Sequence, residues 1–286
     1  MAGNISKTGT ELVDNKKLFI KKVNVDKFDT RTLAFQSNLR QYIKGKFNIN
    51  QYEKIEVKSE NNELIYKVYF DMLDEKDWKP TPENMEIIGK SMAYIHNHSN
   101  RNMSMINLPS KQETYDSMEN WLSLSDNIPF KKESYEKRKT IFREIKPLNQ
   151  AQPKIPLHRD FKPHNIIFNG ESYNLIDFDF AAIDFISLEV MGFLVDIIDT
   201  GLNNVQSFLK SYFGHIDKNI KIVPESFVDD YLSYLCTNTF PFYLHESLES
   251  NNFQQLVEHR NKSLETLYTK RLIIKELIKD IIHENI

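Results

Sequence analysis

The sequence has little cysteine, no basic excess and no long uncharged apolar run. Its single cysteine, Cys236, excludes an internal disulfide and a multi-cysteine zinc site. Lys and Arg total 37 against 40 Asp and Glu, giving a net charge of −3, whereas a general nucleic-acid binder usually has a strongly basic face. The most apolar segment, residues 185–198, is short and contains Glu189 and Asp196. The polar first 17 residues do not resemble a signal peptide. We therefore expect a cytoplasmic protein with neither nucleic-acid nor membrane partners.

The composition is that of a folded protein, with 40% hydrophobic and 12% aromatic residues among 286. Up to about residue 73 the patterns predict mostly strands, and beyond it they predict mostly helices. The expected elements before this change are a strand, a helix and a hairpin, at residues 17–23, 28–45, and 52–58 with 63–69. After it, Met85, Ile88, Met92 and Ile95 recur at helical spacing. We predict an N-terminal part over 1–73 and a C-terminal part over 74–286, with a helical insert at about 100–152.

The segment LHRDFKPHNIIFNGESYNLIDFDF, residues 157–180, contains three candidate catalytic residues, Asp160, Asn165 and Asp177. Asn165 and Asp177 are joined by two short apolar stretches around a turn at Asn169 and Gly170, so a hairpin would bring them together. An amide oxygen and a carboxylate are the hard ligands that Mg²⁺ prefers. Asp160, five residues before Asn165, would orient an attacking hydroxyl toward a γ-phosphate. The segment therefore suits magnesium-dependent phosphoryl transfer.

Neighbouring residues extend this candidate site. Lys162 is a candidate for contact with the transferring phosphate, and His158 is expected to hold the loop by hydrogen bonds. Asp179 has two interpretations, a second metal contact or a cap for the following turn. His96 and His98 are interpreted as residues at the solvent-exposed end of a helix. A metal site is not expected, because no other metal ligands lie near them in the sequence.

The motifs HRDFKPHNIIF and LIDFDFA resemble the catalytic and metal-binding segments of the aminoglycoside phosphotransferase and choline kinase-like superfamily. They also resemble the HRDLKPEN loop of eukaryotic protein kinases. His96 and His158 are 62 residues apart, however, and protein kinases run almost directly from the equivalent helix into this loop. The small-molecule kinases insert helices there, so the gap favours a small-molecule kinase.

The resemblance implies a two-lobed, protein-kinase-like α+β fold with a small N-terminal β-sheet lobe carrying one helix and a larger helical lobe. It implies transfer of the γ-phosphate of ATP or GTP to an alcohol, with Mg²⁺ held by Asn165, Asp177 and Asp179. LFIK resembles the lysine motif of the third strand, which assigns Lys21 to the donor phosphates and leaves Lys22 as a fallback. Gln36 stands where the family has a Glu that pairs with this lysine, so either another acid pairs with Lys21 or the lysine is held less tightly.

The N-terminal lobe also departs from the family pattern. Only Gly3 and Gly9 precede Lys21, and barely twenty residues are available for the usual two strands and phosphate loop. GNISKTG could still form a small backbone cradle for phosphate. This shortened lobe motivates an alternative function, a nucleotide-binding pseudokinase or sensor without turnover. A protein kinase is a further alternative.

The acceptor is expected to be a small hydroxyl compound such as an aminoglycoside-like antibiotic, an amino alcohol or a sugar. Residues 171–200 contain seven acids and no Lys or Arg, a local negative field that could attract a cationic acceptor. The other interpretation is that these acids bind metal, cap helices or face solvent. Aromatic residues near the C-terminal end, for example Phe240, Tyr243 and His245, would either stack on the acceptor or pack in the core.

Overall fold

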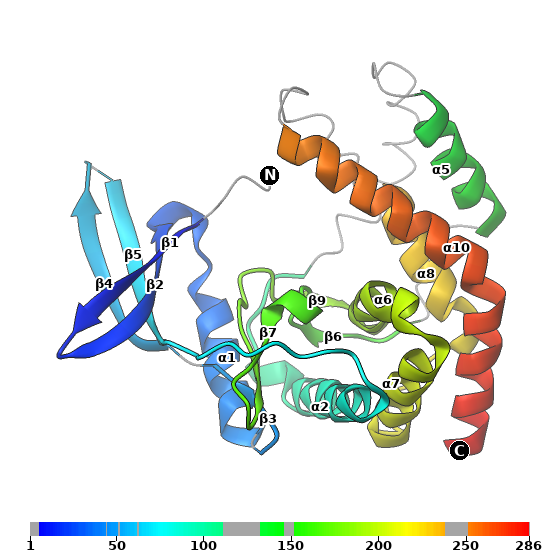
Figure 1. Cartoon of the computed structure of the whole chain (residues 1–286), viewed down its shortest axis with the longest axis horizontal. Coiled ribbons are helices and arrows are strands. Elements are labelled where there is room, and N and C mark those ends of the chain that lie inside the picture. Colours follow the sequence, from blue (N-terminus) through cyan, green and yellow to red (C-terminus); the bar gives the residue numbers. More distant parts are fainter. Residues whose placement is uncertain are drawn as a thin grey trace.

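The computed structural model has a small β-sheet at one end and a larger, mainly helical part beside it (Figure 1). It describes residues 6–43, 45–50, 52–61, 63–110, 132–145, 152–237 and 251–285. This arrangement confirms the predicted fold class, with a small sheet first and helices after it. The division into two domains near residue 73 stays a prediction.

The N-terminal sheet is antiparallel and has the strand order β1-β2-β5-β4. Its strands are β1 (Ser6–Val13), β2 (Lys16–Asn24), β4 (Tyr52–Glu60) and β5 (Glu63–Asp71). The turn between β1 and β2 consists of Asp14 and Asn15, which both have positive φ, as a tight two-residue hairpin requires. The predicted strand around Lys21 and the predicted hairpin after it are both confirmed.

One strand and one tight turn are therefore all that the structure describes before the strand of Lys21. Of the expected phosphate cradle, residues 6–9 lie in β1 and pair with β2 instead of forming a loop, and residues 3–5 lie outside the described residues. The expected shortened lobe is thus a four-stranded sheet.

Helix α1 (Thr30–Tyr42) follows β2 and begins where the sequence predicts. Asp29 is its N-cap, with a side-chain oxygen that accepts a hydrogen bond from the Arg31 N–H at 3.0 Å. Phe35 and Leu39 on its inner face are buried in the same core as the helical part. Strand β3 (Phe47–Ile49) joins this core and pairs in parallel with β8 (Tyr173–Leu175). Both elements therefore pack on the helical part, although they precede β4 and β5 in the chain.

Helix α2 (Pro82–Arg101) is longer than its predicted core of residues 85–96. Thr81 caps its first turn, and Pro82 starts the helix at the position where a missing N–H costs nothing. The helix packs along α7 (Leu202–His215), with which it lies side by side (Figure 1). A Cβ atom at Gly89 would lie 2.5 Å from the backbone oxygen of Phe208, so this close approach requires glycine.

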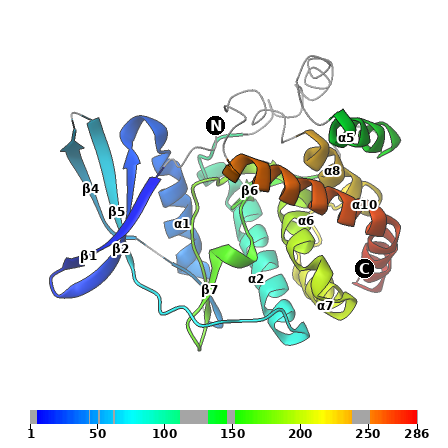
Figure 2. The ribbon, with the colours of Figure 1, turned by 45° about the horizontal axis from the view of Figure 1, so that its top comes forward.

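The helical part contains a three-stranded sheet and a two-stranded sheet. Its other strands are β6 (Lys154–Leu157), β7 (Ile166–Phe168) and β9 (Ala182–Phe185). Its other helices are α5 (Lys132–Ile145), α6 (Ile186–Ile197), α8 (Pro224–Thr237) and α10 (Asn251–Asn285). The long α10 runs across α8, α7 and α6 (Figure 2). No helix in the described ranges combines the length and apolar character needed to cross a membrane.

The predicted helical insert is described only in part. Within it, α5 forms a helix that buries Phe142. Residues 111–131 and 146–151, which include Trp121 and Phe130, lie outside the described residues. The same holds for the aromatic residues between 238 and 250 that were considered for acceptor stacking.

Candidate active site

Two chain segments that follow short strands meet at one end of the helical part. Strand β6 leads into the loop with Asp160, and β7 and β8 form the antiparallel hairpin that the sequence predicts. The backbone N–H of Ile176 donates to the backbone carbonyl oxygen of Asn165 at 3.0 Å. Asp177, the next residue, is thereby placed beside the Asn165 end of the hairpin.

His158 supports this junction, as the sequence predicts. Its ring is fully buried, and Nε2 donates to the Ile176 carbonyl oxygen at 2.8 Å, while Nδ1 accepts the Asp160 N–H at 3.2 Å. The two bonds fix the neutral tautomer with the proton on Nε2. The ring therefore holds both catalytic segments together.

Asp160 lies in the loop with three polar neighbours. Its Oδ2 accepts the Asn165 Nδ2 group at 2.8 Å, and the Lys162 Nζ is 3.7 Å from Oδ1. Burial by itself raises the pKa of Asp160, but the nearby His164 ring, the charge of Lys162 and the bond from Asn165 together lower it below its ordinary value of 3.8. The carboxylate is therefore ionised at neutral pH and able to accept a hydrogen bond.

Asn165 is buried, and both hydrogens of its amide are committed to Asp160. They are donated to the backbone oxygen and to Oδ2 of Asp160, each at 2.8 Å. The amide oxygen consequently points away from Asp160 and is left as an acceptor. This orientation suits the predicted role of Asn165 as a metal ligand.

Lys21 links the small sheet to the catalytic hairpin. Its Nζ lies 2.8 Å from Asp177 Oδ1 and 2.5 Å from Asp179 Oδ2. Burial and the nearby negative charge of Asp177 raise the pKa of Asp179. Their combined effect exceeds the opposing effect of the Lys21 ammonium group. Asp177 has a left-handed backbone with φ 59°, a strained conformation for a non-glycine residue that is frequent at functional sites. The structure thus brings together Lys21 and both acids of the IDFD motif.

Lys22 and Gln36 lie away from this cluster. Lys22 points to the other face of β2 and pairs with Glu60 at 2.8 Å, so Lys21 is the lysine that faces the site. Gln36 donates its amide to the backbone oxygen of Asn50. The acids that pair with Lys21 are therefore Asp177 and Asp179, and no acid of α1 is needed.

A buried hydrogen-bond network supports the loop of Asp160 and was not predicted from the sequence. Glu189 on α6 accepts a hydrogen bond from His96 Nε2 at 2.9 Å through Oε1, and Oε2 accepts the backbone N–H of Arg159. His96 Nδ1 lies 2.9 Å from the Tyr212 hydroxyl, and the His96 side chain is fully buried. The expectation of a solvent-exposed helix end is therefore wrong for His96, because α2 continues to Arg101 and its apolar face carries His96 inside.

Arg159, next to Asp160, needs this support because its backbone is left-handed with φ 64°. Glu189 satisfies its N–H, and Asp184 pairs with its Nε at 2.9 Å. Two of the seven acids of residues 171–200 thus serve the loop. No sequence signal separates Asp184 and Glu189 from the other acids of that stretch.

The oxygen groups present are suitable for a divalent cation. In the described ranges no three His, Cys, Asp or Glu side chains converge as a metal site. Mg²⁺ usually takes only one or two carboxylates, with phosphate and water completing its shell. Asp177 and Asp179 already share one cationic group, the Lys21 ammonium, so their carboxylates attract positive charge to this position. With the Asn165 oxygen they fit the ligand set that the sequence predicts.

Residues 93–217 match the family model APH, described as the phosphotransferase enzyme family. The matched segment contains Asp160, Asn165 and Asp177. Comparison of the sequence with curated proteins finds no match.

Solved structures resemble the whole chain. An amicoumacin kinase in complex with AMP-PNP and Ca²⁺ is 10% identical, with a TM-score of 0.64 over 93% of this chain and 86% of that one. A spectinomycin phosphotransferase in complex with ADP is 14% identical, with a TM-score of 0.65 over 94% and 91%. A choline/ethanolamine kinase family protein from Mesorhizobium loti is 11% identical, with a TM-score of 0.57 over 99% and 94%.

The structural likeness confirms the predicted protein-kinase-like fold. The family match over residues 93–217 is in line with the resemblance to the aminoglycoside phosphotransferase and choline kinase-like superfamily, and it supports the predicted enzyme class, a phosphotransferase with an alcohol group as acceptor.

Proposed function

We propose that this protein is a Mg²⁺-dependent small-molecule kinase that transfers the γ-phosphate of ATP or GTP to a hydroxyl of a small acceptor. The observations that carry the proposal are two side-chain pairs at the β7–β8 hairpin, one of which reaches it from the distant small sheet. Asn165 is bonded to Asp160, and Lys21 from the small sheet reaches Asp177 of the hairpin. Solved proteins with this fold were crystallised with AMP-PNP and Ca²⁺ or with ADP, which supports a nucleotide donor and a divalent cation.

In the proposed reaction, the acceptor hydroxyl oxygen forms a bond to the γ-phosphorus while the bond to the bridging β,γ oxygen breaks and the nucleoside diphosphate leaves. Asp160 accepts the hydrogen bond of the hydroxyl, orients its lone pair and receives its proton, which passes on to solvent. In this proposal Lys162, which lies 3.7 Å from Asp160, contacts the transferring phosphoryl group, and Lys21 contacts the donor phosphates. Bound Mg²⁺ would neutralise charge on the phosphate oxygens, held by Asn165 and Asp177 with Asp179 as a further ligand.

The acceptor class remains that expected from the sequence, an aminoglycoside-like antibiotic, an amino alcohol or a sugar. Structural neighbours named as antibiotic kinases and a choline/ethanolamine kinase support this range. The acid-rich stretch supports a cationic acceptor less than its composition suggests. Asp184 and Glu189 are committed to the loop, and Asp199 pairs with Lys270 at 3.0 Å. A cytoplasmic location would supply both the nucleotide and Mg²⁺.

Two variants test the proposal. Asp160→Asn should keep the thermal stabilisation by ATP with Mg²⁺ and lose about 10²- to 10⁴-fold in phosphate transfer, because the base is removed and the nucleotide site is intact. Asp177→Ala should lose the Mg²⁺-dependent part of that stabilisation. ADP production by wild type is measured with both nucleotides against small alcohols and aminoglycosides. Full activity of Asp160→Asn would exclude the mechanism. Nucleotide binding without turnover of any acceptor would indicate a pseudokinase or sensor instead.

A further inference from the structure

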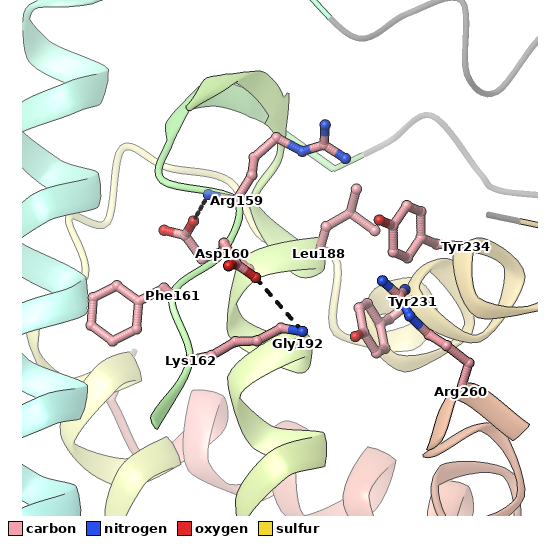
Figure 3. Close-up of a pocket in the computed structure, with 10 residues that line it drawn as sticks. Arg159, Asp160, Phe161, Lys162, Leu188, Gly192, Tyr231, Tyr234 and Arg260 are labelled. Carbon is pink, nitrogen blue, oxygen red and sulfur yellow. Dashed lines mark hydrogen bonds and ion pairs between the residues drawn. The ribbon is translucent and has the colours of Figure 1, made fainter. Parts of the chain in front are cut away.

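A pocket opens beside Asp160, on the side of the loop that faces α6, α8 and α10 (Figure 3). The residues that line it are Arg159, Asp160, Phe161, Lys162, Leu188, Glu189, Gly192, Tyr231, Tyr234 and Arg260. Because Asp160 forms part of its wall, an acceptor bound here can place a hydroxyl against the catalytic carboxylate. The charges in this wall therefore bear on which acceptor the pocket takes.

Both acids of the wall are already committed to protein groups. Glu189 is almost fully buried, and its two oxygens accept hydrogen bonds from His96 and from the Arg159 backbone. Asp160 accepts a bond from Asn165 and is the base of the proposed reaction. The pocket wall consequently offers an acceptor ammonium group no carboxylate beyond the catalytic one.

The cationic side chains of the pocket wall differ in whether they have a carboxylate partner. Arg159 pairs with Asp184, and Lys162 lies 3.7 Å from Asp160. Arg260, which reaches the pocket from α10, makes no hydrogen bond or ion pair with any part of the chain that the structure describes. Its side chain is half-buried next to Tyr231 (Figure 3). A guanidinium is always charged, and holding it half-buried without a partner is unfavourable unless a ligand supplies one.

Asp196 is an acid outside the pocket wall. It lies on α6 one turn after Gly192, but it forms no ion pair with Arg260 within the described chain. Arg260 is therefore the charged side chain of the pocket wall that has no partner of opposite charge among the described residues. A guanidinium presents parallel N–H donors that match a carboxylate or a phosphate in a bidentate manner.

We propose that Arg260 binds an anionic group of the acceptor, so that the preferred substrates are small alcohols that also carry a carboxylate or a similar oxyanion. The hydroxyl lies against Asp160, the anion against Arg260, and the carbon skeleton between them beside the rings of Tyr231 and Tyr234. This assignment rests on the proposed kinase function, and among small hydroxyl compounds it favours anionic acceptors over the cationic and neutral ones named above.

Matched acceptor pairs test the assignment, because each pair keeps the hydroxyl and changes the carboxylate. The pairs are L-serine with ethanolamine, L-homoserine with 3-amino-1-propanol, and D-glucuronate with D-glucose. ADP production is measured with ATP and Mg²⁺ for wild type, Arg260→Gln, Arg260→Lys and Arg271→Gln. Arg271 is the matched control on the same helix, where it lies over the Tyr268 ring and away from the pocket.

The wild type is expected to prefer the carboxylate member of at least one pair by about 10- to 100-fold in kcat/KM, the range for a hydrogen bond to a charged group. Arg260→Gln should remove that preference mainly through KM, Arg260→Lys should restore part of it, and Arg271→Gln should leave it unchanged. Equal use of both members of every pair, or a preference that survives in Arg260→Gln, would overturn the assignment.

Binding is measured separately from turnover, by titrating each carboxylate into wild type and Arg260→Gln loaded with AMP-PNP and Mg²⁺. Binding that depends on Arg260 without any transfer would refute the kinase function and retain the anion site. Transfer to alcohols that lack an anion, with no effect of Arg260→Gln, would retain the kinase function and refute the anion site. Absence of Arg260-dependent binding in every titration, together with no carboxylate preference in turnover, would also refute it.

Discussion

Lys21 and Asp177 are 156 residues apart in the sequence, yet the Lys21 Nζ and the Asp177 Oδ1 are 2.8 Å apart. The same ammonium group lies 2.5 Å from Asp179, so one cation from the small sheet pairs with two acids that follow the β7–β8 hairpin. Lys21 therefore pairs with the acids proposed to hold the metal. When nucleotide and metal bind, we expect the lysine to turn from these carboxylates to the donor phosphates.

A comparison of Lys21→Met with Lys22→Met tests this role. Lys21→Met leaves Asp177 and Asp179 without their cation and should lower the free energy of unfolding by about 1–3 kcal/mol, as for a buried polar group that loses its partner. It should also abolish stabilisation by ATP. Lys22→Met removes only a surface pair with Glu60 and should change stability by less than about 1 kcal/mol. Urea unfolding with and without ATP and Mg²⁺ measures both effects. Equal behaviour of the two variants would contradict the assignment of Lys21.

The two site carboxylates should respond to pH in opposite directions. The pKa of Asp160 is lowered from 3.8 in the folded protein, so its ionised form stabilises the fold above that value, and this contribution is lost as the pH falls. The pKa of Asp179 is raised from 3.8, so its ionisation disfavours the fold as the pH rises through the raised value. Asp160→Asn should thus be most destabilising near neutral pH, and Asp179→Asn should gain stability relative to wild type above about pH 4. Melting temperatures across this range check both trends, and parallel curves would contradict them.

The sequence was sufficient for the parts of the site that lie close together in the chain. Asn165 and Asp177 are joined by two apolar strands and a Gly170 turn, so local pairing alone brings them together. The strand and hairpin around Lys21 follow from similarly local patterns. Local patterns could not predict the environments of His96 and Arg260, because the residues around them belong to α6 and to the loop of Asp160, far away in the sequence. A histidine among apolar residues on α2 signals burial only once α7 is known to cover that face.

Glu189 should matter more for stability than its partner Tyr212. Glu189→Ala leaves His96 Nε2 and the Arg159 N–H buried without an acceptor, which should cost about 2–5 kcal/mol. Tyr212→Phe removes only the hydroxyl bonded to His96 Nδ1 and should cost about 1 kcal/mol. Glu189→Gln retains an acceptor oxygen and should recover part of the loss. Unfolding in urea gives the ranking, and a larger effect of Tyr212→Phe than of Glu189→Ala would refute the proposed support of the loop.

Gly89 should be irreplaceable at the contact between α2 and α7, whereas Gly9 in β1 should tolerate alanine. An alanine Cβ at position 89 would lie 2.5 Å from the Phe208 oxygen and 3.2 Å from the Tyr212 nitrogen, both backbone atoms that cannot move without separating the helices. We expect Gly89→Ala to cost about 1–3 kcal/mol despite the better helix propensity of alanine. At Gly9 nothing lies within 4 Å of the new Cβ, so Gly9→Ala should be neutral or slightly stabilising. Because Tyr212 bonds to His96 behind the catalytic loop, Gly89→Ala should also reduce phosphate transfer in protein that remains folded. Urea unfolding and ADP production of both variants decide the matter, and wild-type stability of Gly89→Ala would show that the two helices are not packed this closely.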